Sequence, residues 1–259
     1  MRIATWNVNS IKARLPHVLD FLAGAKPDVL LLQELKCQTE DFPRLEIEAA
    51  GYRAVAAGQK SYNGVAVLAR GPIEVLADRL PGSRDDPQAR YLEARIDGVR
   101  VASIYLPNGN PIDSDKFAYK LAWFERLERH AAHLLESGEP VVLAGDYNVI
   151  PGPDDVYDPA DWVNDALWRI ESRNALRRIL WRGYVDAFRV LNPLPHQYTF
   201  WDYQAGRWQR NEGIRIDHML LSPQAADRLV ASGIDRGPRG REKASDHTPV
   251  WCELATPAP

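Results

Sequence analysis

The feature of this chain that most constrains its fold is a repeated pattern in which an apolar, strand-like run ends in a short polar signature. The signatures are IATWNVNS with Asn7, VLLLQELK with Glu34, VVLAGDYN with Asp146 and Asn148, RIDHMLL with Asp217, and SDHTPV with Asp246 and His247. Strands made of Val, Leu, Ile and Ala are buried, so carboxylates and amides at their ends have no structural use unless those ends converge on a shared polar cleft. We therefore expect one functional site built from distant parts of the sequence.

The size and composition of the chain favour a single stable domain. A length of 259 residues with 45% hydrophobic content is enough to bury a core without disulfides. Cys37 and Cys252 are too few for a disulfide framework and have no CxxC spacing, so we interpret them as reduced thiols, although one bridge between them remains open. The chain starts with a strand-like pattern and has no run of about 18 apolar residues. We expect one domain over residues 1–259, in a soluble cytoplasmic protein that is not exported.

The overall charge is mildly acidic. A net charge of −3 and an isoelectric point of about 6.1 argue at first against binding to a polyanion. A cleft that holds several acidic metal ligands makes the balance acidic, however, while separate Arg and Lys side chains can still contact phosphates at its rim. We expect at least half of the basic clusters to be solvated surface. These clusters are Arg84, Arg90 and Arg95; Arg207, Arg210 and Arg215; and Arg236, Arg239, Arg241 and Lys243.

Strand patterns and helical patterns alternate along the chain. The stretch YLEARIDGVRVASIYLP reads as two alternating arms joined by an Asp97-Gly98 hairpin turn. The last helical pattern has Ser222 as its N-cap and Gly233 beyond its end. Two sheets packed face to face with helices outside fit this mixture. The other strand patterns are residues 2–8, 28–33 and 64–69, and the helical patterns are residues 15–23, 114–136, 171–182 and 223–231.

The acidic loop, residues 151–168, is rich in Asp and Pro and interrupts this alternation. Its Asp-Pro and Pro-Asp steps break any long element, so we expect a loop with about one helical turn. It directly follows GDYN, and it either borders the cleft or is an insertion without a role in chemistry.

The polar residues at the strand ends have the chemistry that phosphodiester hydrolysis needs: a positioned oxygen nucleophile, a cation for the phosphorane oxygens and help for the leaving alkoxide. Asp146 and Asn148 suit a water-activating carboxylate with an amide beside it, although Asp-x-Asn after a strand is also a common turn. Glu34 is a hard oxygen ligand of the kind that Mg²⁺ prefers, and its alternative role is an ion pair with Lys36. These residues indicate a metal-dependent phosphodiester site.

The SDHTPV signature adds an imidazole to this set. His247 is easily kept cationic near neutral pH, and a cation there could stabilise a pentavalent phosphorus. Asp217 would orient and charge it. We interpret the other histidines as surface or satisfied core residues; they are His17, His130, His133, His196 and His218.

Together these residues resemble the exonuclease III and apurinic/apyrimidinic endonuclease branch of the endonuclease/exonuclease/phosphatase superfamily. The resemblance covers almost the whole chain and implies a single domain of that superfamily over residues 1–259. It implies a four-layer α/β sandwich, with two packed mixed β-sheets flanked by helices, and Mg²⁺ or Mn²⁺ as cofactor. In order, the matching motifs are TWNVNSI, LLQELK, YNGVAVL, YLPNG, GDYNV, GYVDAFR, YTFWDY, GIRIDHMLLS and SDHTPVW.

The resemblance also implies roles for residues of this chain. It makes Glu34 the principal metal ligand, with Asn7 nearby and Asp246 at a second or moving metal position. Asp146 would activate the attacking water, and Asn148 would help position that water or the scissile phosphate. It further implies Asp217 paired with His247 at the transition state, Tyr105 on the phosphate, and Asn108, Arg90 and Tyr62 as DNA contacts.

One departure from the family pattern lies in YTFWDY. Where enterobacterial exonuclease III has a tryptophan placed to probe an abasic gap, this chain has Phe200, with Trp201 next to it. An aromatic side chain that can stack is compatible with abasic-site recognition, and it leaves the balance between endonuclease and exonuclease activity open. We expect Phe200 and Trp201 to contact DNA.

The function implied is a metal-dependent DNA repair phosphodiesterase that cleaves 5′ to abasic sites and acts as a 3′-to-5′ exonuclease and 3′-end-cleaning enzyme on duplex DNA. We expect a cytoplasmic monomer, used at the nucleoid, without a membrane partner. A phospholipid or inositol phosphate hydrolase of the same superfamily is disfavoured, because the chain lacks the membrane-facing apolar hairpins of those branches. A non-catalytic nucleic-acid-binding relative is disfavoured because the candidate ligands are all retained.

Overall fold

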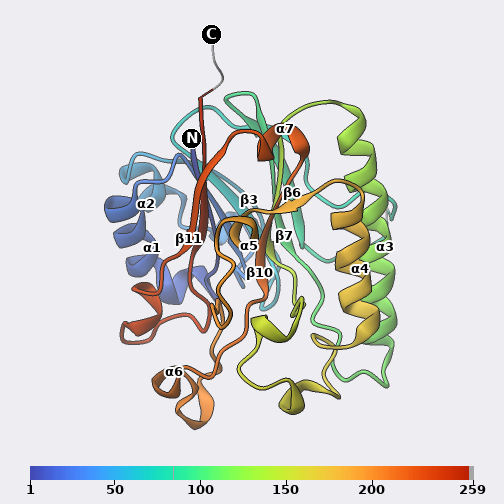
Figure 1. Ribbon diagram of the computed structural model, residues 1–259. Coiled ribbons are helices and arrows are strands. Elements are labelled where there is room, and N and C mark those ends of the chain that lie inside the picture. The colour runs from blue at the N-terminus through green and yellow to red at the C-terminus, as the bar shows by residue number, and fades with distance from the viewer. Residues whose placement is uncertain (84, 257–259) are drawn as a thin grey trace.

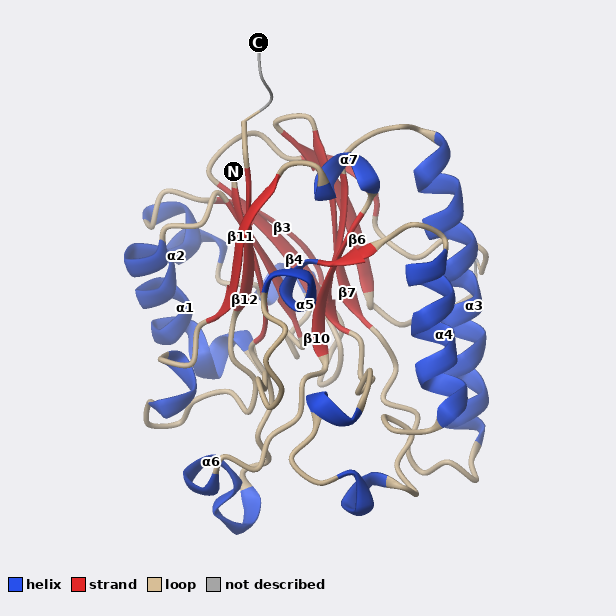
Figure 2. Ribbon diagram, in the orientation of Figure 1, coloured by secondary structure: helices blue, strands red, loops and turns tan. Residues whose placement is uncertain are grey.

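The structure is a computed structural model that describes residues 1–83 and 85–256 (Figure 1). Arg84, one of the basic residues noted above, lies outside the described residues. Two six-stranded sheets pack face to face, and helices cover both outer faces (Figure 2). The predicted four-layer α/β sandwich is confirmed.

The first sheet consists of β1 (Arg2–Asn7), β2 (Val29–Gln33), β3 (Arg53–Ala57), β4 (Val65–Ala69), β11 (Leu229–Ile234) and β12 (Val250–Leu254). Their order in the sheet is β11-β12-β1-β2-β4-β3. The sheet is mixed, because β1 runs parallel to β2 and antiparallel to β12. The predicted strands at 2–8, 28–33 and 64–69 all belong to it.

The second sheet consists of β5 (Glu74–Ala77), β6 (Tyr91–Ile96), β7 (Val99–Tyr105), β8 (Val141–Asp146), β9 (Val185–Asp186) and β10 (Asp217–Leu221). Their order is β5-β6-β7-β8-β10-β9. The predicted hairpin is confirmed, since β6 and β7 pair antiparallel around the turn at Asp97 and Gly98. β7 runs parallel to β8, and β10 runs antiparallel to β8.

Helices close the sandwich on both sides. In Figure 1 α1 and α2 lie outside the first sheet, and α3 and α4 lie outside the second. One apolar core fills the space between the sheets, and two others fill the spaces between each sheet and its helices. The helices are α1 (Ile11–Ala25), α2 (Arg44–Ala49), α3 (Asp115–Glu136), α4 (Ile170–Trp181), α5 (Ala187–Leu191), α6 (Arg207–Arg210) and α7 (Pro223–Ala226), with 3₁₀ turns at Thr39–Asp41, Pro153–Asp155, Pro159–Trp162, Gln204–Gly206 and Pro238–Gly240.

The prediction of a helix over residues 223–231 is wrong beyond the first turn. Ser222 does cap α7, its side chain accepting a hydrogen bond from the Ala225 backbone, but the helix stops at Ala226. The chain then forms β11, which pairs antiparallel with β12. Gly233 lies inside this strand, where a Cβ would meet the ring of Trp251 at 2.8 Å. Pairing with β12 outweighs the local helical pattern.

Two further expectations concern the acidic loop and the cysteines. The acidic loop contains two 3₁₀ turns rather than one. A bridge between Val156 and Ile214 fixes it to the segment just before β10. Cys37 and Cys252 are buried and free, so the bridge left open by the sequence does not form. None of the helices in the described part of the chain has the length and apolar character needed to cross a membrane.

Candidate active site

Strand ends from both sheets meet at one end of the sandwich, the lower end in Figure 1. Because β10 is antiparallel to β8, its first residue, Asp217, lies opposite Asp146, the last residue of β8. Tyr105 ends β7 and lies opposite Asp146 on the other side. The first sheet contributes Asn7, which ends β1, and Glu34, which follows β2.

Asn7 links the carboxylates of the two sheets. Its Nδ2 donates one hydrogen bond to Glu34 Oε1 and another to Asp146 Oδ2, each 2.9 Å long. Ligand atoms of Glu34, Asp146 and His247 all lie within 4.8 Å of one another. One compact polar centre therefore spans the junction between the sheets.

Glu34 is held in a demanding backbone conformation. Its φ of 51° is left-handed, and its carbonyl accepts a hydrogen bond from the Ser10 backbone at 2.7 Å. Burial disfavours ionisation, but the hydrogen bond from Asn7 and the Lys36 ammonium, 3.0 Å away, outweigh it and lower the pKa of Glu34. The ion pair with Lys36 that the sequence left as an alternative therefore coexists with a charged carboxylate at the centre.

The donor set fits a hard divalent cation. Glu34 and Asp146 offer carboxylate oxygens a few ångströms apart, as Mg²⁺ and Mn²⁺ prefer. Such an ion would neutralise charge on the phosphate oxygens and would lower the pKa of a bound water. Asn7 presents its amide nitrogen to the carboxylates. Asp246 lies outside the compact centre, and its Oδ1 accepts a hydrogen bond from Asn9 Nδ2 at 3.0 Å. The metal-binding roles of Asn7 and Asp246 stay predictions.

Asp146 has the surroundings of a general base. Burial, together with the negative charges of Asp217 and Glu34, raises the pKa of Asp146 despite the opposing effect of His247. The backbone N–H of Asn148 donates to Asp146 Oδ1 at 2.9 Å and fixes the carboxylate. A positioned carboxylate with a raised pKa can accept the proton of an attacking water.

His247 is paired with Asp217. Nδ1 of the imidazole lies 2.8 Å from Asp217 Oδ2, and Nε2 lies 3.7 Å from Asp146 Oδ2. Burial alone would lower the pKa of His247, but the carboxylates of Asp217 and Asp146 outweigh it and raise that pKa. A buried imidazolium in this position can stabilise negative charge that develops on a phosphorane.

Three of the predicted DNA contacts lie around one cavity. The guanidinium of Arg90 lies 4.7 Å from the centre of the Tyr105 ring. Asn108 Nδ2 donates to Asn148 Oδ1 at 3.2 Å, which joins Asn108 to the loop after β8. Arg90, Asn108 and the exposed Tyr62 line one cavity of about 580 Å³. Their contact with DNA stays a prediction.

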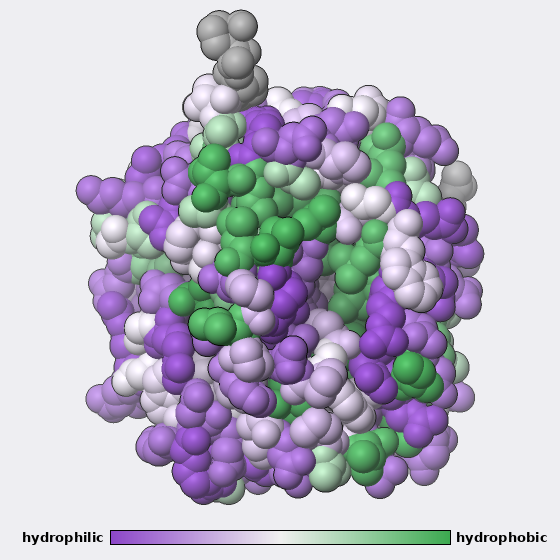
Figure 3. Space-filling model, in the orientation of Figure 1, coloured by the Kyte–Doolittle hydropathy of each residue, from purple (hydrophilic) through white to green (hydrophobic). Residues whose placement is uncertain are grey.

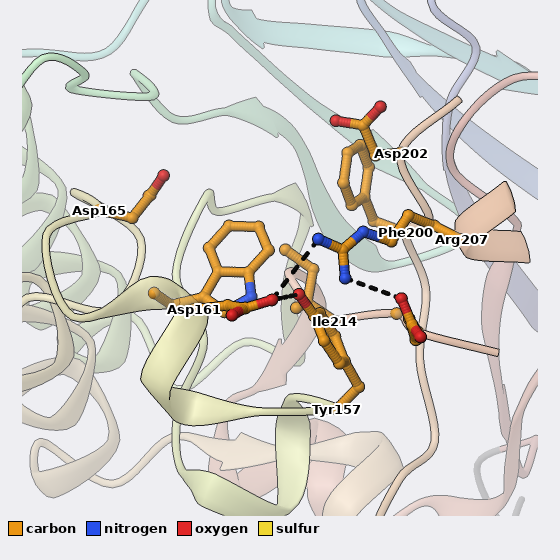
Figure 4. A pocket seen from close by; sticks show the side chains of 10 residues that line it. Tyr157, Asp161, Asp165, Phe200, Asp202, Arg207 and Ile214 are labelled. Atoms are coloured by element: carbon orange, nitrogen blue, oxygen red, sulfur yellow. Dashed lines mark hydrogen bonds and ion pairs between the residues drawn. The ribbon is translucent and has the colours of Figure 1, made fainter. Parts of the chain in front are cut away.

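Phe200 lies beside His247, with its ring centre 4.9 Å from that of the imidazole. It lines a pocket of about 410 Å³, here called the Phe200 pocket (Figure 4). The acidic loop therefore borders the site, the first of the two roles considered for it. The lining residues are Tyr157, Asp161, Trp162, Asp165, Phe200, Asp202, Arg207, Glu212, Gly213 and Ile214.

The prediction that Trp201 contacts DNA is wrong. Its side chain is 0% exposed, so its ring has no free face on which a base could stack. The ring packs at 4.8 Å against Trp208, and its Nε1 donates to Asn211 at 3.3 Å. The residue alternation that turns Phe200 toward the pocket turns Trp201 into the interior.

The arginines of the cluster around Arg215 form ion pairs with carboxylates of the same chain. Arg215 is 1% exposed and lies between Asp155 and Asp186, at 2.7 Å from each. Arg207 and Arg210 are both paired with a neighbouring glutamate. On the face shown in Figure 3, the surface around α6 is mainly hydrophilic. All three guanidinium groups of this cluster are therefore already paired with carboxylates.

Sequence analysis missed Lys120. This α3 residue is 0% exposed, and its Nζ donates to the carbonyls of Asn108 and Asn148 at 2.9 and 2.6 Å. It thereby ties the loop after β7 to the loop after β8. The sequence did contain a signal for this burial, because Lys120 lies at helical spacing from Phe124 and Leu127, which are buried on the same helix.

Comparison with known proteins agrees with this geometry. Residues 4–247 match the model of the Endonuclease/Exonuclease/phosphatase family. Exodeoxyribonuclease III of Haemophilus influenzae is 31% identical, over 98% of this chain and 100% of its own length. An exodeoxyribonuclease of Bacillus subtilis is 30% identical, over 96% of this chain and 98% of its own.

Solved structures agree as well. The 3′ phosphatase NExo from Neisseria, bound to a product DNA hairpin, superposes with a TM-score of 0.96 at 39% identity and covers 99% of this chain and 100% of its own. An AP endonuclease from Archaeoglobus fulgidus gives 0.95 at 37% identity, with the same coverage. The chain belongs to the Endonuclease/Exonuclease/phosphatase family. Within that family it is an enzyme of the exonuclease III and AP endonuclease branch, which hydrolyses phosphodiester bonds.

Proposed function

We propose that this DNA repair nuclease cleaves duplex DNA 5′ to abasic sites and removes nucleotides or blocking groups from 3′ ends, with Mg²⁺ or Mn²⁺ as cofactor. The observation that carries the proposal is the meeting of Glu34, Asp146 and the Asp217–His247 pair at the junction of the two sheets. This set combines a metal ligand, a base and a cation within one polar centre, which is what phosphodiester hydrolysis requires.

Each residue of the centre has a role in the proposed reaction. Glu34 holds the cation, and Asp146 takes the proton of the attacking water. Asn148 fixes Asp146 and positions that water. His247, kept charged by Asp217, stabilises the negative charge that accumulates on phosphorus, and Tyr105 contacts the phosphate.

The Phe200 pocket supports action at abasic sites. It adjoins His247, and the ring of Phe200 offers an apolar face to a sugar that has lost its base. Relatives named as an exodeoxyribonuclease, a 3′ phosphatase and an AP endonuclease support action at both 3′ ends and internal sites.

We further propose that residues 1–259 act as one domain, and that the protein is a cytoplasmic monomer that works on the nucleoid. The continuous core between the sheets, to which both the first and the last strand contribute, supports a single folding unit. The likeness to bacterial exodeoxyribonucleases supports the location.

The test uses two labelled duplexes, one with an internal tetrahydrofuran abasic analogue and one with a recessed 3′ end. Each is incubated with Mg²⁺, with Mn²⁺ or with chelator, and with wild type, Glu34→Ala or Glu40→Ala. Glu40 is an exposed carboxylate outside the cluster of Glu34, Asp146 and His247, and it serves as the matched control.

We expect metal-dependent cleavage of both duplexes by wild type and Glu40→Ala, and loss of both activities in Glu34→Ala. Tight binding without cleavage of either duplex would favour a non-catalytic relative instead. Cleavage that persists with chelator would contradict the metal assignment.

A further inference from the structure

Arg207 lines the Phe200 pocket and contacts residues of both of its walls. The pocket lies between the acidic loop and the segment of residues 200–214, which carries α6. Figure 4 shows the Arg207 guanidinium reaching from its own segment toward Tyr157 and Asp161 of the acidic loop. Arg207 therefore joins the two walls of the pocket.

Several contacts hold the guanidinium in place. It lies 4.7 Å from the centre of the Tyr157 ring, 3.5 Å from Asp161 Oδ2 and 2.8 Å from Glu212 Oε2. The Tyr157 hydroxyl also donates a hydrogen bond to Asp161. Because the Arg207 side chain is 29% exposed, each ion pair is weak alone, and the arrangement depends on their sum.

The charges around Arg207 argue against a role in binding phosphate. Asp161 and Glu212 already pair with the guanidinium, and Asp165 and Asp202 add further negative charge to the lining. A phosphate in the pocket would meet these carboxylates and be repelled. The geometry suits a contact that holds the two walls of the pocket together. We call this set of contacts, made by Arg207 with Tyr157, Asp161 and Glu212, the clasp.

We propose that Arg207 is a specificity-determining residue, which clasps the acidic loop to α6 so that the pocket closes around a sugar without a base. The inference rests on the proposed function. A base-free sugar offers little surface and needs both walls close to it. An intact terminal nucleotide also stacks its base on its neighbour and depends less on the clasp. Loss of the clasp therefore lowers abasic-site cleavage more than 3′-nucleotide removal.

Arg207→Ala is compared with Arg210→Ala. Arg210 lies on the same helix and pairs with Glu212 at 2.6 Å, but it does not line the pocket. The readouts are kcat/KM on the abasic and recessed duplexes, and the slope of log Kd for DNA against log salt concentration. We expect the ratio of abasic to 3′-end cleavage to fall about tenfold in Arg207→Ala and less than about twofold in Arg210→Ala, with the wild-type salt slope in both.

An equal loss on both duplexes, with a salt slope smaller by about one, would make Arg207 a phosphate contact and overturn the proposal. An unchanged ratio would overturn it as well. Should Arg207→Ala fail to fold, the isosteric Asp161→Asn opens the same clasp and has to meet the same criteria. Wild-type cleavage of the abasic duplex tests the proposed function separately. If that cleavage is absent, the salt slope still decides whether Arg207 binds phosphate.

Discussion

At the scale of single residues, the site contains backbone conformations that local sequence does not encode. Glu34 and Asn148 have φ values of 51° and 49°. Asn adopts this left-handed region readily, whereas Glu does not, so the hydrogen bond from Ser10 to the Glu34 carbonyl has to hold it. The sequence predicts Glu34 as a ligand from its chemistry and its place after a strand. Its conformation depends on a neighbouring loop and could not be predicted.

The Asp217–His247 pair leads to a prediction about turnover. Asp217→Asn keeps the shape of the side chain but removes the charge that holds His247 as a cation. We expect kcat to fall roughly 100-fold or more and Kd for DNA to change little, because the lost interaction acts on the transition state. Single-turnover kinetics and equilibrium binding measure the two quantities. Equal losses in both would argue against the role, and the exposed Asp227→Asn is the control.

Lys120 leads to a prediction about pH. Burial lowers the pKa of Lys120 to about 7, against the opposing charges of Asp165 and Asp146. Between that value and the unfolded value of about 10.5, the unfolded chain binds a proton that the folded protein does not. The free energy of unfolding therefore rises with pH across this window, by at most about 1.4 kcal/mol per pH unit.

In Lys120→Met this contribution is absent. Urea unfolding at pH 7 and pH 9 should show that wild type gains about 1–3 kcal/mol relative to the variant. Comparison of the two proteins cancels the titration of all other groups. Identical pH dependence in both would contradict a neutralised Lys120.

At the scale of elements, strong periodicity with a clear cap predicted the helices well. Ser114 caps α3, and the helix ends at Glu136, as its pattern indicates. The same reasoning failed after α7, because β11 lies beside β12 and completes the first sheet, a long-range pairing that a short window of sequence does not contain. The prediction that Trp201 contacts DNA failed for a related reason, because the burial of a side chain is set by the packing of distant segments.

The acidic loop leads to a prediction about its anchor. Asp155 is buried and accepts a hydrogen bond from Arg215 Nε at 2.7 Å and another from Arg189. Asp155→Ala leaves Arg215 buried with one partner fewer, and we expect a loss of about 3 kcal/mol in the free energy of unfolding. The exposed neighbour Asp154→Ala should cost less than about 0.5 kcal/mol in the same urea titration. A similar cost for both would show that the anchor is dispensable.

At the scale of the whole molecule, the two sheets each supply part of the candidate metal site. A cation bound between Glu34 and Asp146 would therefore stabilise the packed pair of sheets. At 100 times its Kd, Mg²⁺ adds about 2.7 kcal/mol, which corresponds to a rise in Tm of roughly 5 °C or more. Thermal unfolding should show this rise in wild type and Glu40→Ala. Its persistence in Glu34→Ala would place the ion elsewhere.

The first sheet unites segments from the two ends of the described chain, with β12 between β1 and β11. His247 comes shortly before β12, so it is among the last residues of the site to leave the ribosome. Until β12 pairs with β1, this imidazole is not held against Asp146 and Asp217. In the proposed mechanism, a nascent chain that has not yet formed β12 lacks the cation that acts on phosphorus, and we expect it to cleave nucleic acid poorly. Nuclease activity is thereby expected to appear only after β12 has paired with β1, late in synthesis.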